Sequence, residues 1–121
     1  MSDDNRFLIG DKAEKLYFDI LDKTTNRKKY PVKFRRVADK LQEVSINIYT
    51  SVVGANEITP NSESRKQHRF DFQTEAVASC KILNSLIKYC LHSKLISSAT
   101  AEKWSNAATE VKKMTLAWRK F

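Results

Sequence analysis

The sequence predicts an all-α protein, an antiparallel up-down four-helix bundle, from two observations. Apolar residues recur at spacings of three and four in four separate segments, which is the periodicity of amphipathic helices. Glycine and proline each occur only twice in 121 residues, too few for the turns of a hairpin-rich protein. Four amphipathic helices joined by short connections bury their apolar stripes against one another as a bundle.

The first helix is expected to follow a loose tail over residues 1–10, so that a single domain occupies residues 11–121. Asp11 can serve as its N-cap, with Glu14 completing a capping box three residues later. This helix is expected to be shorter than the other three, because "TTNRKKYP" interrupts its pattern. Its apolar stripe comprises Ala13, Leu16, Tyr17, Ile20 and Leu21.

The second helix can begin at Pro31, since the missing N–H of proline would have no helical partner in a first turn. We expect this helix to end near Val53 or Asn56, before the loop "GANEITPNSES". Its apolar stripe is long and comprises Phe34, Val37, Ala38, Leu41, Val44, Ile48 and Val52.

The third helix can be capped by Ser62 or Ser64, because serine hydroxyls accept hydrogen bonds from the first free N–H groups. Its inward positions are Phe72, Ala76, Cys80, Leu83, Ile87 and Cys90, with Phe70, Val77 and Leu86 widening the stripe. The two cysteines lie about 15 Å apart along one helix, too far for a disulfide. We therefore expect buried thiols in a reducing cytoplasm.

The fourth helix follows the short connection "HSKLISSAT" and can be capped by Ser97, Ser98 or Thr100. Its stripe comprises Trp104, Ala107, Ala108, Val111, Met114 and Trp118. Because both tryptophans lie on this stripe, they are expected in the core or in a subunit interface rather than in a base-stacking site.

No motif in the sequence indicates a catalytic or metal site. His68 and His92 lack partners at metal-ligand spacings, apart from one weak pair of His68 with Asp71, and are expected at the surface. No glycine-rich phosphate loop, nucleophile elbow, CxxC or inward Glu-x-x-His motif occurs. No apolar run approaches 18 residues, and no cationic leader precedes an apolar segment. We expect no enzyme activity, no cofactor, no membrane span and no signal peptide.

The net charge of +8 is unevenly distributed along the chain. Residues 1–23 hold six acids and four bases, whereas residues 26–44 hold seven bases and two acids. A strongly basic surface favours nucleic acid or another polyanion as the partner. The alternative is a solvated helix face with surplus lysine.

A cationic ridge is predicted on the second helix, because four bases recur there at helical spacing and can follow a line of phosphates. The ridge comprises Lys29, Lys33, Arg36 and Lys40, with Lys28 preceding it and Arg35 lying nearer solvent. A second cluster at the start of the third helix, Arg65, Lys66 and Arg69, should lie at the opposite end of the bundle. Tyr30 could stack on a base or pack against the start of the second helix.

Two stretches of the sequence resemble one known family of four-helix bundles. They are "RFDFQTEAVASCKILNSLIKYCLHSKLIS", with an Arg-Phe start and small residues between leucines, and "LISSATAEKWSNAATEVKKMTLAWRK", which closes with a tryptophan. The chain is similar over residues 13–119 to the 23S rRNA intervening-sequence proteins and to Avd-like accessory proteins of diversity-generating retroelements. The intervening-sequence branch usually has an Asn-Ile…Glu-Gly element where this chain has "VVGANEI", which favours the Avd-like branch.

The resemblance implies a homopentameric barrel with a basic surface. In the Avd-like branch it also implies association with a reverse transcriptase and with template RNA or cDNA, in support of mutagenic retrohoming. Three other roles remain open at this point: an intervening-sequence protein of unknown role, an assembly module that docks an acidic protein, and a plasmid-mobilisation accessory.

Overall fold

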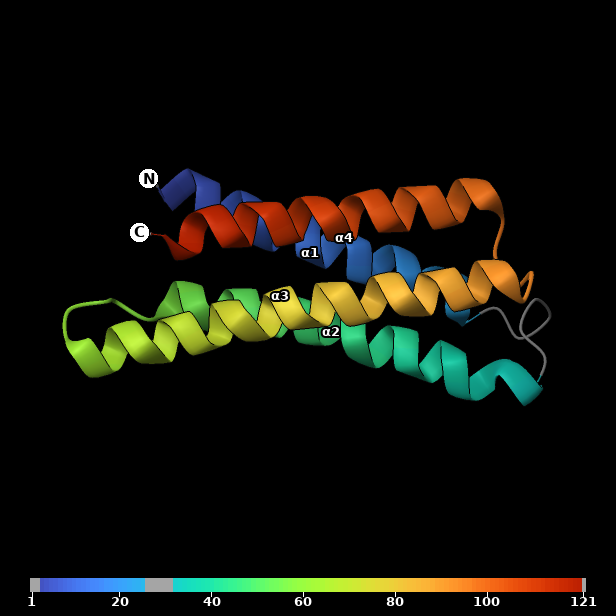
Figure 1. Ribbon diagram of the computed structural model, residues 1–121, viewed down its shortest axis with the longest axis horizontal. Helices are drawn as coiled ribbons and strands as arrows, with labels where there is room; N and C mark the ends of the chain where they lie inside the picture. Colours follow the sequence, from blue (N-terminus) through green and yellow to red (C-terminus); the bar gives the residue numbers. More distant parts are fainter. Residues whose placement is uncertain (1–2, 26–31, 121) are drawn as a thin grey trace.

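The computed structural model describes residues 3–25 and 32–120; the side chains of residues 3–7 and of Lys33 lie outside the description. Within these residues four α-helices form an up-down bundle, in which consecutive helices run in opposite directions (Figure 1). They are α1 (Asp3–Thr24), α2 (Arg35–Glu57), α3 (Glu63–His92) and α4 (Ser98–Arg119), with a short 3-10 helix, η1 (Val32–Phe34), before α2. The predicted all-α bundle is confirmed. No helix in the described part of the chain combines the length and apolarity needed to cross a bilayer.

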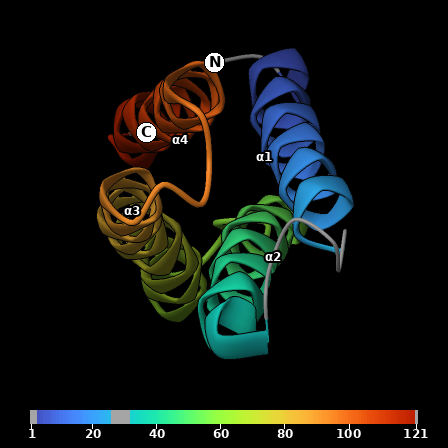
Figure 2. The same cartoon turned by 90° about the vertical axis from the view of Figure 1, so that its right-hand side faces the viewer.

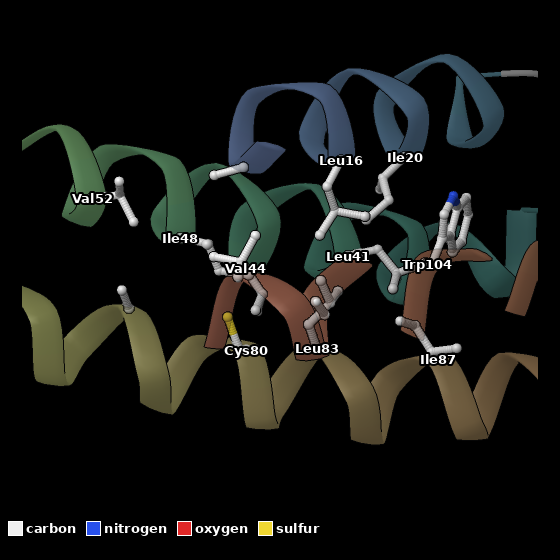
Figure 3. Close-up of a cluster of buried hydrophobic side chains, with 14 of the residues drawn as sticks. Leu16, Ile20, Leu41, Val44, Ile48, Val52, Cys80, Leu83, Ile87 and Trp104 are labelled. Atoms are coloured by element: carbon white, nitrogen blue, oxygen red, sulfur yellow. The ribbon is translucent and has the colours of Figure 1, made fainter. Parts of the chain in front are cut away.

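The helices surround one core, with α1, α2, α3 and α4 arranged in sequence order around the bundle axis (Figure 2). Each predicted stripe supplies residues to this core, and side chains such as Leu41, Leu83 and Trp104 converge between the helices (Figure 3). Trp104 and Trp118 are both almost fully buried, as expected. Cys80 and Cys90 are buried free cysteines, so their predicted burial is confirmed. Several predicted core positions are only partly buried: Tyr17, Leu21, Phe34, Val37, Phe72, Leu86, Ala107 and Met114.

The start of α1 differs from the prediction. The helix begins at Asp3, so residues 3–10 belong to it rather than to a loose tail, and Asp11 is not its N-cap. The physical reason is Ile9, which lies one turn before Ala13, is 1% exposed and continues the buried stripe. Packing of an apolar face outweighs the intrinsic helix cost of Gly10. With 22 residues α1 is as long as α4, so the expectation of a shorter first helix is also wrong.

The other helix termini agree with the sequence more closely. The N-caps of α3 and α4 are Ser62 and Ser97, whose hydroxyls accept hydrogen bonds from the backbone N–H groups of Arg65 and Thr100. Glu57 ends α2, one residue beyond the predicted limit. Pro31, the expected start of that helix, lies outside the described residues.

Both glycines lie within helices and neither has a positive φ, so alanine can adopt the same backbone conformation. The effect of a Gly→Ala substitution therefore depends on the space around the added Cβ. A Cβ at Gly10 would meet nothing within 4 Å, whereas a Cβ at Gly54 would lie 2.9 Å from the Phe72 ring. We expect Gly10→Ala to raise the free energy of unfolding by about 0.5–1 kcal/mol through helix propensity. We expect Gly54→Ala to lower it by about 1–2 kcal/mol, because the ring must move. Urea denaturation of both variants measures this, and equal stabilisation would contradict the Gly54–Phe72 contact.

Candidate nucleic-acid interface

The first turns of α2 present three exposed bases, Arg35, Arg36 and Lys40, which we call the α2 basic face. Their orientation follows from the helix period, because Leu41 and Val44 on the opposite side are buried in the core. The predicted contacts Lys28 and Lys29 lie outside the described residues, as does the side chain of Lys33. That these three lysines extend the α2 basic face stays a prediction.

The electrostatics of the α2 basic face favour an anion. Among the described residues, only Lys40 of this face has an ion pair, with Nζ 3.5 Å from Oε1 of Glu43, and both side chains are largely exposed. Exposed pairs of this kind contribute about 0–1 kcal/mol, so Glu43 is a weak competitor for a phosphate. The first turn of α2 contains no acidic residue, and the partial positive charge of a helix N-terminus adds to that of the arginines.

The second predicted cluster lies at the opposite end of the bundle, as expected, because α2 and α3 begin at opposite ends (Figure 1). Its three bases make different contacts. The Nε of Arg65 donates a 2.8 Å hydrogen bond to the carbonyl of Thr59 in the preceding loop. Lys66 is exposed, with its Nζ 3.5 Å from Oε1 of Glu63. The guanidinium of Arg69 lies over the Trp118 ring, 5.0 Å from its centroid.

Two further residues at this end, Phe70 and Arg119, were not predicted as site residues from the sequence. The guanidinium of Arg119, at the end of α4, lies 4.9 Å from the centroid of the Phe70 ring. Its Nη1 donates a 3.2 Å hydrogen bond to Oγ1 of Thr74. Phe70 was expected to widen the core stripe but is 42% exposed. Only the predicted topology could have indicated that these two residues meet, because the end of the fourth helix lies beside the start of the third in an up-down bundle.

A small pocket of about 210 Å³ opens at this end. We call it the α3–α4 pocket; it is lined by Pro60, Lys66, Arg69, Phe70, Gln73 and Arg119. Three bases and one exposed ring therefore converge from two helices.

A larger cavity of about 370 Å³ lies between α1 and α4. The indole Nε1 of Trp104 donates a 2.6 Å hydrogen bond to Oδ2 of Asp19, and Nζ of Lys103 lies 3.5 Å from the same oxygen. Lys12 pairs with Glu110 at 2.8 Å across the same two helices. Cations and carboxylates of this cavity largely neutralise one another, which makes it a poorer polyanion site than either basic end.

Both histidines lie at the surface, and both cysteines lie in the interior. His68 is exposed and stacks on Phe72 with ring centroids 5.1 Å apart, and His92 is exposed as predicted. No cluster of three or more possible metal ligands occurs in the described part of the chain. Burial raises the pKa of Cys80 from 9.0 to about 12 and that of Cys90 to about 11, so both thiols are protonated at neutral pH.

Comparisons with known proteins bear on the fold. No family model matches the chain, and no curated protein matches it. It is similar to the crystal structure of a protein with unknown function from the S23 ribosomal protein family of Bacteroides thetaiotaomicron. The two align with a TM-score of 0.80 over 97% of this chain and 99% of the other, at 14% sequence identity. The shared feature is the fold. It is the fold expected from the resemblance to the intervening-sequence proteins, while the Avd-like branch stays a prediction.

Proposed function

We propose that the chain is a non-catalytic nucleic-acid-binding protein that holds RNA or cDNA by its phosphates. The observation that carries this proposal is the α2 basic face, where Arg35, Arg36 and Lys40 are exposed together and, among the described residues, only Lys40 has an ion pair. Phosphate contacts supply most of the sequence-independent affinity for nucleic acids. The net charge of +8 adds long-range attraction to the same partner.

The proposal includes the finer role implied by the resemblance, an accessory protein that presents the template to a reverse transcriptase in a diversity-generating retroelement. It also includes assembly into a homopentamer. Each added subunit would contribute another α2 basic face, and linked weak sites give a higher overall affinity than any one site. The solved S23-family structure is of a protein with unknown function and supplies no competing activity.

The test is a charge reversal, Arg35→Glu/Arg36→Glu/Lys40→Glu, with RNA binding followed by fluorescence anisotropy over a salt series. We expect affinity to fall roughly tenfold or more at low salt, and the negative slope of log K against log[salt] to become smaller in magnitude by about two to three. The fold should survive, because acidic residues near a helix N-terminus interact favourably with its dipole. Light scattering of the same samples reports the number of subunits with and without RNA.

The matched control reverses three exposed lysines elsewhere, in Lys81→Glu/Lys88→Glu/Lys113→Glu, which changes the net charge by the same amount. If the control weakens RNA binding as much as the α2 variant does, total charge rather than the α2 basic face determines binding. Wild-type protein that binds no RNA at low salt would overturn the proposed function itself.

A further inference from the structure

The α3–α4 pocket combines charge with an exposed aromatic ring, which the α2 basic face lacks in its described residues. The charge comes from Lys66 and Arg119, and the ring is that of Phe70. A phenylalanine that is 42% exposed beside several cations contributes less apolar burial than an inward-facing one. This arrangement calls for an explanation other than core packing alone.

The Phe70 ring and the Arg119 guanidinium form a cation–π pair held by two helices. The guanidinium lies 4.9 Å from the ring centroid, within the range of a cation–π contact. The hydrogen bond from Arg119 to Thr74 fixes the guanidinium from a second direction. Flat surfaces of this kind, an aromatic ring or an arginine plane, are those on which unpaired bases stack in single-stranded nucleic-acid sites.

We propose that the α3–α4 pocket binds one unpaired nucleotide of a single-stranded nucleic acid. Its base stacks on the Phe70–Arg119 pair, and its phosphate interacts with Lys66 and Arg119. The inference rests on the proposed function for the class of partner, but it uses other residues at the opposite end of the bundle. A volume of about 210 Å³ is smaller than the pockets of drug-sized ligands and suits a single base.

The strand preference follows from the geometry of stacking. Bases within a duplex are already stacked on their neighbours, so their faces are closed to a protein side chain, whereas unpaired bases offer both faces. Duplex binding through phosphates at the α2 basic face should therefore not depend on Phe70. The alternative is a fastening role, in which Arg119 on Phe70 and Arg69 on Trp118 hold the end of α4 against α3.

The experiment compares a short, unstructured single-stranded RNA with the same strand annealed to its complement, both labelled for fluorescence anisotropy. We expect Phe70→Ala to weaken single-strand binding by about five- to a hundredfold while changing duplex binding less than about twofold. Phe70→Leu retains apolar bulk without a ring and should also lose single-strand affinity. Arg119→Gln should reduce the salt slope for the single strand by about 0.7, the value for one phosphate contact.

The matched control is Phe18→Ala, since Phe18 is a 53% exposed phenylalanine on α1 outside the α3–α4 pocket. Equal losses of single-strand affinity in Phe18→Ala and Phe70→Ala would overturn the inference. So would Phe70→Leu binding single strands as wild type does, because that result leaves only the fastening role. Duplex binding that depends on the α2 basic face, with no dependence of single-strand binding on Phe70, overturns this inference and leaves the proposed function standing. Absence of binding to either RNA overturns both.

Discussion

Leu83→Ala is expected to lower the free energy of unfolding by about 3–5 kcal/mol, the upper range for large-to-small substitutions in a core. Leu83 is 0% exposed and lies on α3 between Cys80 and Ile87, facing the interior of the bundle (Figure 3). Removing its side-chain methyl groups loses their transfer free energy and leaves a cavity that helices on all sides cannot fill by collapse. Urea denaturation followed by far-UV circular dichroism measures the loss.

Ile82→Ala is the control for this substitution. Ile82 is the adjacent residue on the same helix but is 49% exposed, so its truncation should cost less than about 1 kcal/mol. A cost for Leu83→Ala as small as that for Ile82→Ala would contradict the placement of Leu83 in the core. A large cost at both positions would instead indicate that a second subunit covers the face that contains Ile82.

The second large effect is a loss of stability at alkaline pH that originates in the two buried thiols. Burial raises the pKa of Cys80 from 9.0 to about 12 and that of Cys90 from 9.0 to about 11. Above pH 9 the unfolded chain releases these protons while the folded protein retains them, so the unfolded state is favoured. Stability is therefore unaffected by the thiols below pH 9 and falls as pH rises, until each thiol also ionises in the folded protein.

We expect the free energy of unfolding to fall by up to about 1.4 kcal/mol per pH unit for each cysteine above pH 9. Urea denaturation at a series of alkaline pH values measures it against the double variant Cys80→Ala/Cys90→Ala. Lysines and tyrosines titrate in the same range, but they are present in both proteins, so the difference between the two pH profiles isolates the thiols. Identical slopes in the two profiles would show that the thiolates are not excluded from the folded interior.

Helix content and the inward faces were readable from the sequence because they depend on local periodicity. Residues such as Leu41 and Leu83 repeat at three and four and are fully buried, since a helix places those positions on one side. The caps Ser62 and Ser97 were also recognisable, because a serine hydroxyl reaches a backbone N–H only three residues away. The start of α1 was mistaken, because burial of Ile9 depends on neighbouring helices rather than on its own segment.

The two candidate sites differ in how much of each could be predicted from local sequence. The sequence by itself determined the excess of positive charge, its concentration near the start of α2 and the outward direction of Arg35, Arg36 and Lys40, since charge and helical period are local properties. Only the tertiary structure brought Arg119 to Phe70 and Thr74, residues at least 45 positions apart in the chain. It likewise joined Asp19 to Trp104. Such contacts depend on which helix ends meet and on how each helix is rotated, and these follow from the packing of all four stripes into one core.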